Sequence, residues 1–337
     1  MKAVFFLGSR RMELREIKNP KPGSKDVIVK VGVCGICGSD IHSYAQSKKM
    51  EVIPGHEITG TIVEVGDDIS SFKKGDRVAV YAIFNCGECY YCKRGLTQFC
   101  RSMKIIGGEM DGGYAEYVRV PESCLLRIPK EITLEEASLL LDVIGVPNHG
   151  LKRLAPRKDD SVVVYGCGPV GLATIHILWL SGLRKIFAVD IVDFRLKVAE
   201  EMGAQVVINA REEDPVKRVK ELTDGVGTDL AIDAAGAQTA EINALNSVRM
   251  GGRVLFIGSN PIGKLEINIT QQVVFRDVTL IGTFYFRKDE FNENIQLLIR
   301  GRDKLRNIIT HIFPLEKINE AFQIVEKKKA LRVLIKP

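Results

Sequence analysis

Short hydrophobic stretches separated by turn residues occupy the chain up to about Asp142. Val27–Val33, Ile58–Val65 and Arg77–Val80 are rich in β-branched residues, and Gly, Pro and Asp lie between them. β-Branched residues favour strands, whereas Gly and Pro favour the turns that connect strands. The pattern therefore predicts many short strands that form a barrel-like or sandwich-like unit.

After about Asp142 the pattern becomes an alternation of apolar strands and helical stretches. Ser161–Tyr165 is a continuous β-branched run, as expected of a strand buried on both faces of a parallel sheet. The elements predicted after it are helix Val170–Leu180, strand Ile186–Asp190, helix Phe194–Met202, strand Val206–Ile208, helix Pro215–Leu222, strand Asp229–Asp233, helix Ala240–Val248, strand Arg253–Ile257 and strand Val278–Gly282. This alternation indicates βαβ units in a doubly wound sheet, a fold of the α/β class.

The last segment, residues 283–337, is too short to form a domain by itself. It contains two helical stretches, Asp289–Arg300 and Leu315–Lys327, and a final strand, Arg332–Ile335. We expect this segment to complete the N-terminal unit. The predicted first domain is therefore 1–143 together with 283–337, and the predicted second domain is 144–282.

Composition and charge exclude several classes of protein. Of the 337 residues, 45% are hydrophobic and 27% are charged, as is usual for a globular protein. The net charge of +6 is spread over the whole chain, which argues against a nucleic-acid partner. The apolar run Ala3–Leu7 is too short for a secretory signal, and no apolar stretch reaches the roughly 18 residues of a membrane span. We expect a cytoplasmic protein without a membrane partner.

Four of the eight cysteines lie close together, and clustered cysteines in such a protein more often bind metal or do redox work than form disulfides. The spacing Cys86-x2-Cys89-x2-Cys92-x7-Cys100 allows four thiolates to surround a tetrahedral zinc ion. Four sulfur ligands leave no open position, so the predicted site is structural. The alternatives are reduced free thiols and an iron–sulfur cluster, although the spacing does not match the ferredoxin patterns.

A glycine-rich motif follows the strand Ser161–Tyr165 and opens the next predicted helix. In Gly166-Cys-Gly168-Pro-Val170-Gly171, the first glycine allows a tight turn, the second lets backbone approach a pyrophosphate, and the third lets helix and strand pack closely. Asp190 ends the next strand, 19 residues after Gly171. A carboxylate there can accept both ribose hydroxyls and repel a 2′-phosphate, which favours NAD over NADP. The alternative is a structural turn with no cofactor.

A third constellation combines a thiol, an imidazole and a carboxylate. Cys37 lies in a C-x-x-C motif with Cys34, and His56 and Glu57 are adjacent. One thiolate and one imidazole supply two of the three ligands that a catalytic zinc ion requires. Spacing alone also allows a redox pair of cysteines and a buried structural histidine.

These residues together resemble the zinc-dependent medium-chain dehydrogenases, in particular the polyol branch of sorbitol and galactitol-phosphate dehydrogenases, with threonine dehydrogenase nearby. The matching motifs are Cys37-Gly-Ser-Asp-x-His42, Gly55-His-Glu57, the four-cysteine segment and Gly166–Gly171. Their order matches over essentially the whole chain. The resemblance implies a GroES-like β-rich catalytic domain, completed by the C-terminal segment, and an inserted Rossmann coenzyme domain.

The resemblance also implies roles for individual residues. Cys37 and His56 would bind a catalytic zinc ion, Glu57 would lie beside it as an alternative ligand, and Asp142, seven residues before His149, would be the third ligand. Asp142 departs from the Glu that is usual in the polyol branch. The further roles are a proton relay for Ser39 and His42, an orienting role toward His56 for Asp40, and cofactor binding for Gly166, Gly168, Val170, Gly171, Asp190 and Arg195.

The predicted activity is therefore oxidation of a secondary alcohol, a polyol or sugar derivative, by NAD+ to give a ketone. Two zinc ions per chain are expected, one catalytic and one structural. Within the enzymes, the alternatives are a threonine 3-dehydrogenase-like and a simple secondary-alcohol dehydrogenase. Outside the enzymes, the alternative is an NAD-binding structural or sensor protein. The resemblance further implies a homo-oligomer, a dimer or a tetramer.

Overall fold

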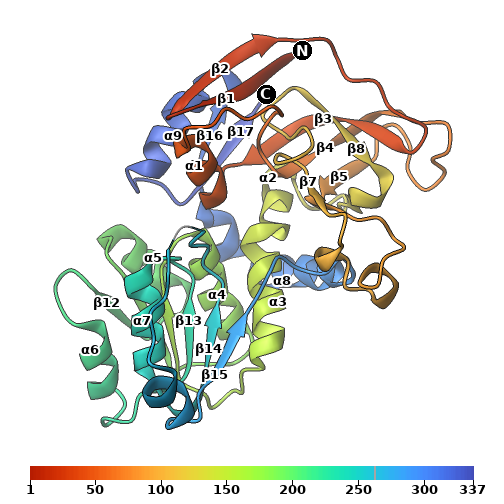
Figure 1. Cartoon of the computed structure of the whole chain (residues 1–337). Helices are drawn as coiled ribbons and strands as arrows, with labels where there is room; N and C mark the ends of the chain where they lie inside the picture. The colour runs from red at the N-terminus through yellow and green to blue at the C-terminus, as the bar shows by residue number, and fades with distance from the viewer. Residues whose placement is uncertain (262) are drawn as a thin grey trace. The chain divides into compact units, whose positions relative to one another are not determined.

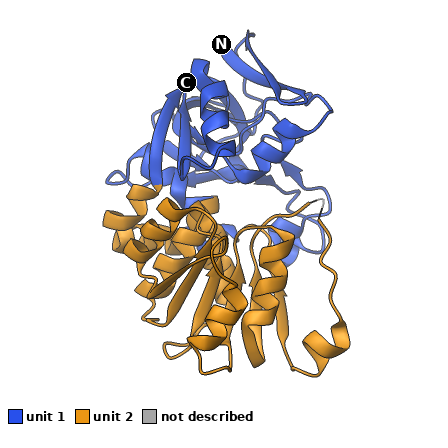
Figure 2. Cartoon of the chain, turned by 90° about the vertical axis from the view of Figure 1, so that its left-hand side faces the viewer, with its two compact units in different colours: residues 1–141, 287–291, 309–337 blue, residues 142–286, 292–308 orange. Residues whose placement is uncertain are grey.

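The computed structural model describes residues 1–261 and 263–337, which form two compact units (Figure 2). Unit 1 comprises Met1–Leu141, Arg287–Phe291 and Ile309–Pro337, and unit 2 comprises Asp142–Phe286 and Asn292–Ile308. In the described residues, no helix combines the length and the apolar character needed to cross a membrane.

The division of the chain differs from the predicted one chiefly in its last segment. We predicted that 1–143 and all of 283–337 form the first domain, whereas the structure places 142–143, 283–286 and Asn292–Ile308 in unit 2. The reason is the packing of helix α8 (Phe291–Leu305) beside helix α3 (Asp142–Leu154). The Asn148 amide of α3 donates to Asn294 Oδ1 of α8 at 2.9 Å, and Lys152 Nζ lies 2.7 Å from Glu293 Oε2.

Unit 1 is built around a seven-stranded sheet, in which β8 pairs with β3 beside the main path β16-β17-β3-β4-β5-β9 (Figure 1). Its strands are β3 (Asp26–Gly35), β4 (Glu57–Val65), β5 (Arg77–Val80), β8 (Tyr117–Pro121), β9 (Leu125–Arg127), β16 (Ile309–Pro314) and β17 (Arg332–Lys336). The three strands predicted in the N-terminal region lie within β3, β4 and β5. Because β17 pairs with β3, the end of the chain completes this sheet, as expected.

Smaller elements surround the sheet of unit 1. Two two-stranded sheets pair β1 (Lys2–Gly8) with β2 (Arg11–Glu16) and β6 (Ile83–Phe84) with β7 (Lys104–Ile105). The helices are α1 (Gly38–Ala45), α2 (Leu134–Ala137) and α9 (Ile318–Glu326). The core contains a cluster of four aromatic rings, Phe6, Tyr44, Tyr114 and Phe322, that joins β1, α1 and α9.

Unit 2 contains a six-stranded parallel sheet in the order β12-β11-β10-β13-β14-β15. Its strands are β10 (Val162–Tyr165), β11 (Ile186–Asp190), β12 (Val206–Asn209), β13 (Thr228–Asp233), β14 (Val248–Phe256) and β15 (Thr279–Gly282). Its helices are α3, α4 (Pro169–Leu180), α5 (Asp193–Met202), α6 (Pro215–Glu221), α7 (Gln238–Ser247) and α8. Counted within the unit, the strand order is 3-2-1-4-5-6, the order of the doubly wound Rossmann fold.

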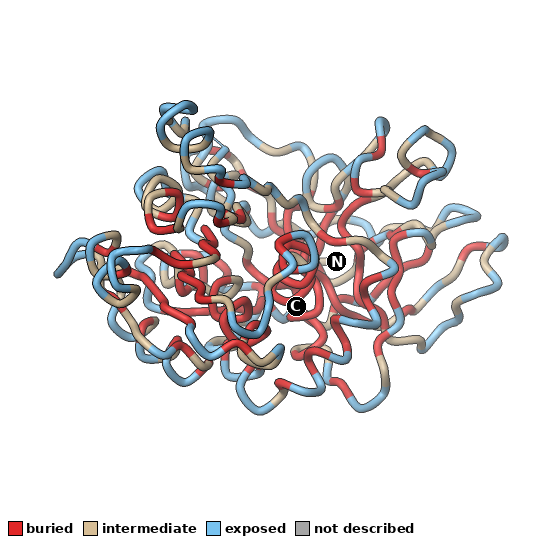
Figure 3. The backbone as a smooth tube through the Cα atoms, turned by 90° about the horizontal axis from the view of Figure 1, so that it is seen from below, coloured by how far each residue is buried: buried red, intermediate tan, exposed pale blue. Residues whose placement is uncertain are grey.

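Burial follows the predicted pattern in the central strands. Every residue of β10 and β11 is buried, as a strand covered on both faces requires. Along the backbone, buried residues gather in the interior and exposed residues lie mostly in the outer loops (Figure 3). The helix predicted over Ala240–Val248 instead ends at Ser247, because the β-branched Val248 already begins β14. The strand β16 and a π-helical turn at Ile269–Val274 were not predicted.

Candidate active site

The four clustered cysteines lie in the segment between β6 and β7 of unit 1. Their Sγ atoms are 3.5 Å apart for Cys89–Cys92 and Cys86–Cys100, 3.9 Å for Cys89–Cys100 and 4.0 Å for Cys86–Cys92. Four thiolates bound at ~2.3 Å to a tetrahedral zinc ion lie about 3.8 Å apart. The observed spacing therefore fits zinc.

Electrostatics in this cluster also point to a cation. Backbone N–H groups of Arg101 and Cys92 lower the pKa of the Cys89 thiol to about 6, which favours the thiolate at neutral pH. Burial and the neighbouring thiols raise the pKa of Cys92 to about 12. Without a cation, the four sulfurs cannot all carry negative charge at neutral pH. A divalent ion would offset this repulsion, so the donor set fits a structural zinc site.

A second cluster brings together Cys37, His56, Glu57 and Asp142. One ligand atom of each lies within 4.8 Å of those of the others. Cys37 is the N-cap of α1, His56 directly precedes β4, Glu57 begins β4, and Asp142 begins α3. A thiol, an imidazole and a carboxylate form a donor set that suits a catalytic zinc ion with an open position.

Asp40 fixes two members of this cluster. It is 4% exposed, its Oδ1 lies 3.4 Å from His56 Nδ1, and its Oδ2 accepts the backbone N–H of Cys37 at 2.9 Å. Burial alone would raise the pKa of Asp40, but the charge of His56 and the hydrogen bond from the Cys37 N–H hold it below its ordinary value. With Nδ1 of His56 as donor, the lone pair lies on Nε2, the atom that would bind a metal ion.

Glu57 is held by a residue that the sequence analysis did not identify. Arg332 of β17 is 2% exposed and forms an ion pair with both Glu57 oxygens, one of them through Nη1 at 2.7 Å to Oε1. Its Nη1 also donates to the Ile36 carbonyl at 3.0 Å. Because Glu57 binds Arg332 through both oxygens, Asp142 is the better candidate for the third metal ligand. The available signal was an arginine within the apolar strand Arg332–Ile335, since a buried cation requires an anionic partner.

Ser39 and His42, the predicted proton relay, lie on α1 immediately after Cys37. Both are exposed, and their spacing of three residues places them on one side of the helix. A hydroxyl and an imidazole in this position can pass a proton from the metal-binding cluster to solvent.

The three glycines of the turn between β10 and α4 have different surroundings. Gly166 has φ +95°, a conformation that L side chains rarely adopt. A Cβ on Gly171 would lie 1.8 Å from the Gly166 carbonyl oxygen, so helix and turn pack in direct contact. A Cβ on Gly168 would meet nothing within 4 Å, which leaves open space at the N-cap of α4. Val170 follows in the first turn of that helix. This arrangement suits a pyrophosphate at a helix N-terminus.

Asp190 stands at the carboxyl end of β11, beside this turn. Its Oδ2 accepts the N–H of Cys167 at 2.7 Å, and its Oδ1 accepts the N–H groups of Ile191 and Val192 at 2.7 and 3.0 Å. The carboxylate therefore connects the glycine-rich turn to the next loop. Arg195 of α5 lies near enough for its charge to act on the Cys167 thiol, whose pKa is raised by burial and by Asp190. Both predicted cofactor residues are thus close to the turn.

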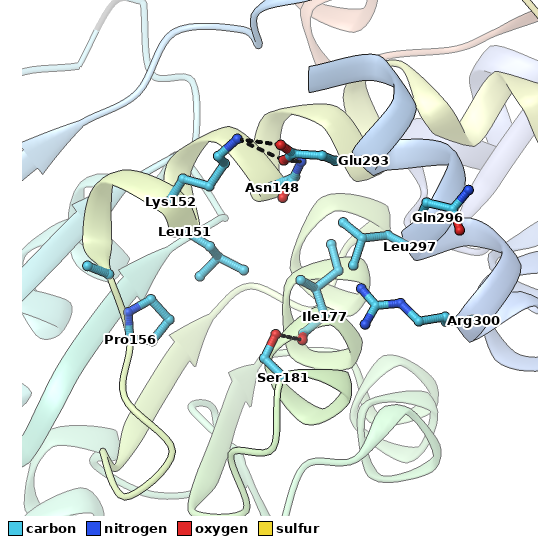
Figure 4. A pocket seen from close by; sticks show the side chains of 11 residues that line it. Asn148, Leu151, Lys152, Pro156, Ile177, Ser181, Glu293, Gln296, Leu297 and Arg300 are labelled. Atoms are coloured by element: carbon cyan, nitrogen blue, oxygen red, sulfur yellow. Dashed lines mark hydrogen bonds and ion pairs between the residues drawn. The ribbon is translucent and has the colours of Figure 1, made fainter. Parts of the chain in front are cut away.

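A cavity of about 500 Å³ in unit 2 lies apart from these residues. It is lined by α3, α4 and α8, with the Lys152–Glu293 ion pair at its rim (Figure 4). None of the predicted site residues lines it, and we do not assign it to the active site.

Comparison with known proteins identifies the family of the chain. Residues 23–130 match the family model of the alcohol dehydrogenase GroES-like domain, and residues 169–300 match that of the zinc-binding dehydrogenases. The L-threonine 3-dehydrogenase of Pyrococcus horikoshii is 36% identical over 330 residues, which cover 96% of this chain and 94% of the relative.

Solved structures show the same fold over the whole chain. A structure described as a short chain alcohol dehydrogenase from E. coli CFT073, complexed with NADH, has a TM-score of 0.90 and 28% identity and covers 100% of this chain and 99% of its own. A Sinorhizobium meliloti 1021 protein bound to NADP has a TM-score of 0.90 and 26% identity, with the same coverage. With its GroES-like and Rossmann-like domains, the chain belongs to the zinc-dependent medium-chain dehydrogenase family.

Proposed function

We propose that this chain oxidises a secondary alcohol to a ketone with NAD+, at a zinc ion held by Cys37, His56 and Asp142. The observation that carries the proposal is the second cluster, in which a thiol, an imidazole and carboxylates from distant parts of the sequence converge within 4.8 Å. Three protein ligands leave one position for the substrate oxygen. A zinc ion held there would act as a Lewis acid and lower the pKa of a bound hydroxyl group.

The residues around the cluster account for the rest of the chemistry. Asp40 holds the His56 ring and the backbone of Cys37, so the ligands are positioned before a metal ion binds. Ser39 accepts the alcohol proton as it releases its own hydroxyl proton toward His42, and His42 passes that proton to solvent. Both side chains lie exposed on α1. NAD+ supplies the hydride acceptor, so the alcohol loses one proton and one hydride.

NAD rather than NADP is supported by the position of Asp190. Its carboxylate lies at the end of β11, where the adenosine ribose of a dinucleotide is bound in this fold. A negative charge there accepts hydrogen bonds from ribose hydroxyls and repels a 2′-phosphate. The solved relatives hold NADH in one case and NADP in another, so the family alone does not choose the cofactor.

For the substrate, the relatives favour the threonine-type alternative over the polyol expectation. The Pyrococcus horikoshii relative that matches nearly the whole chain is named L-threonine 3-dehydrogenase. None of the relatives described above is named a polyol dehydrogenase. We therefore put forward L-threonine, a 2-amino-3-hydroxy acid with a secondary hydroxyl, as the first substrate to test.

The test is a substrate panel with NAD+ and the purified full chain, read as NADH formation. The panel includes L-threonine, sorbitol, a sugar-alcohol phosphate, an aldonate and a simple secondary alcohol. We expect the highest kcat/KM with L-threonine, loss of turnover in Cys37→Ser, and retained turnover in Cys124→Ser, which alters a buried cysteine outside both clusters.

Different failures of this test have different meanings. A polyol preferred at least tenfold over L-threonine would overturn the substrate but keep the reaction class. NAD+ binding without turnover of any alcohol would overturn the enzyme proposal in favour of a structural or sensor protein.

A further inference from the structure

A buried tyrosine of unit 1 makes a polar contact with the group that orients the metal-binding cluster. Tyr114 is fully buried, and its hydroxyl donates to Asp40 Oδ2 at 2.7 Å. The same hydroxyl lies farther, at 3.4 Å, from the Gly35 carbonyl. The shorter contact to a carboxylate is the stronger one, because a charged acceptor strengthens and shortens a hydrogen bond.

Asp40 is the point at which three contacts meet. Oδ2 accepts the N–H of Cys37 and the hydroxyl of Tyr114, while Oδ1 faces His56 Nδ1 at 3.4 Å. With Oδ2 held by two donors, the plane of the carboxylate is fixed, and so is the direction in which Oδ1 meets the imidazole. The orientation of His56 therefore depends on Tyr114 through Asp40.

The backbone of Tyr114 is tied to the same region. Its N–H donates to the Pro54 carbonyl at 3.0 Å, and its carbonyl accepts the N–H of Val4 at 2.9 Å. A Cβ on Gly55, the residue before His56, would lie 2.9 Å from Tyr114 Cδ1, so the ring packs directly on that backbone. The ring and the hydroxyl thus act on His56 by two routes, packing and hydrogen bonding.

We propose that Tyr114 is a positioning residue for the catalytic metal centre, and that its hydroxyl, by fixing the Asp40 carboxylate, holds His56 in the orientation that binds zinc. This inference rests on the proposed metal centre of Cys37, His56 and Asp142. The hydroxyl does not touch the metal or the substrate, so its effect reaches the metal only through Asp40 and His56.

Tyr114→Phe separates the hydroxyl from the ring. The ring, its backbone bonds and its packing on Gly55 remain, while Asp40 Oδ2 loses one of its two donors. Tyr44→Phe is a matched control, because Tyr44 is buried in the same aromatic cluster, 5.5 Å from Phe6 and 5.1 Å from Phe322 between ring centroids. Among the described residues, its hydroxyl makes no hydrogen bond to Asp40.

The measurement is zinc retention in the holoprotein during competition with a chelator. The four-cysteine site is an internal reference, since it lies in the same unit and has no contact with Asp40. In Tyr114→Phe, we expect the zinc at Cys37 to bind about tenfold more weakly, the lower end of the effect of outer hydrogen-bond partners on metal affinity. The structural zinc and the Tyr44→Phe variant should behave as in the unaltered protein.

A cobalt-substituted protein gives a second readout that does not depend on turnover. Altered His56 geometry should change the visible spectrum of cobalt at the catalytic site in Tyr114→Phe and not in Tyr44→Phe. Unchanged affinity and spectrum in Tyr114→Phe would overturn the proposal, and so would equal weakening of both zinc sites. Zinc content of Cys37→Ser separates this proposal from the one it rests on. If Cys37→Ser holds as much zinc as the unaltered protein, the proposed metal centre is wrong, whatever the role of Tyr114.

Discussion

At the scale of single residues, the buried ion pair of Glu57 and Arg332 leaves Asp142 as the carboxylate of the second cluster that can bind a metal ion. Glu57 and Arg332 are 0% and 2% exposed, and they neutralise each other through two contacts. Desolvation makes such a pair costly to build, but removing one partner leaves the other charge buried and uncompensated. Both Glu57 oxygens are thus bound to Arg332, and Asp142 is the carboxylate that we propose as a metal ligand.

Replacing Arg332 should therefore destabilise the protein strongly. Arg332→Met should lower the free energy of unfolding by about 3–5 kcal/mol, because the Glu57 carboxylate loses its buried partner. Denaturant unfolding of the full chain measures this loss. The double variant Glu57→Gln/Arg332→Met should recover a large part of it, and a double variant no more stable than Arg332→Met would contradict the ion-pair account.

Asp190 should control the choice of cofactor. In Asp190→Gly the repulsion of a 2′-phosphate is removed, and we expect kcat/KM with NADP+ to rise relative to that with NAD+. Some loss with both cofactors should accompany the change, since Cys167 N–H loses its acceptor. Steady-state kinetics with both cofactors measure the ratio, and an NAD+/NADP+ ratio equal to that of the unaltered protein would remove Asp190 from the ribose.

At this scale the sequence predicted residues that belong to local motifs and missed those that act across the chain. Cys37, His56 and the four cysteines have characteristic neighbours in the sequence, and in the structure they lie in two clusters of possible metal ligands. Arg332 lies 275 residues from Glu57, so no spacing rule connects them. Tyr114 gave no signal either, because a tyrosine near turn glycines is usually a core residue.

Among the elements, the turn between β10 and α4 shows best how sequence pattern and packing agree. Its first and third glycines are required by the backbone itself, through a positive φ at Gly166 and the contact of Gly171 with the Gly166 carbonyl. Gly168 is different, because φ −72° and ψ −178° are ordinary values for any residue. Only a bound ligand would require glycine at that position.

Two alanine variants separate these roles. Gly171→Ala should destabilise the protein by about 3 kcal/mol, since overpacking costs more than the roughly 1 kcal/mol that alanine gains over glycine in a helix. Gly168→Ala should unfold like the unaltered protein but bind NAD+ about tenfold more weakly or worse, because its methyl group occupies the space for the pyrophosphate. Calorimetric titration with NAD+ and denaturant unfolding distinguish the two, and normal NAD+ affinity in Gly168→Ala would contradict the assigned cofactor site.

Element prediction succeeded where burial dictates the residue type. The strands β10, β11 and β13 are buried nearly throughout, and each carries a short apolar stretch that marks it in the sequence. β16 escaped prediction because its residues alternate between half-buried and exposed positions and include a histidine and a proline. The end of α7 was misplaced by one residue because a helix and the following strand meet there without a loop.

At the scale of the whole molecule, each unit is assembled from segments far apart in the sequence. The C-terminal strand β17 completes the sheet of unit 1, whereas α8 returns to unit 2 through packing on α3. The first of these was predicted, because the last segment is too short to fold alone. The second was not, because a helical pattern shows that one face is buried but not which unit buries it.

Stability of the folded chain should fall in mild acid, and His176 on α4 is one cause. Burial lowers the pKa of His176, a hydrogen bond to the Met202 carbonyl partly opposes this, and Lys304 adds to it. The folded state therefore binds this proton less readily than the unfolded chain, whose histidine pKa is about 6.5. The stability that neutral His176 provides is complete above that value and decreases as pH falls below it toward the folded pKa.

Unfolding free energies at pH 7.5 and 5.5 test this effect against His176→Asn, which keeps a donor for the Met202 carbonyl but does not titrate. We expect a smaller loss of stability between the two pH values in the variant than in the unaltered protein. Equal losses in both would contradict this, because they would show that folding does not lower the pKa of His176.

The chain should hold two zinc ions of different character, and zinc content measured together with turnover tests this most directly. We expect two zinc ions in the unaltered protein and one in each of Cys37→Ser and Cys89→Ser. Turnover should disappear in Cys37→Ser, whereas Cys89→Ser should chiefly lose thermal stability and keep turnover at temperatures where it remains folded. A Cys37→Ser protein that keeps both zinc ions and full turnover would contradict the account.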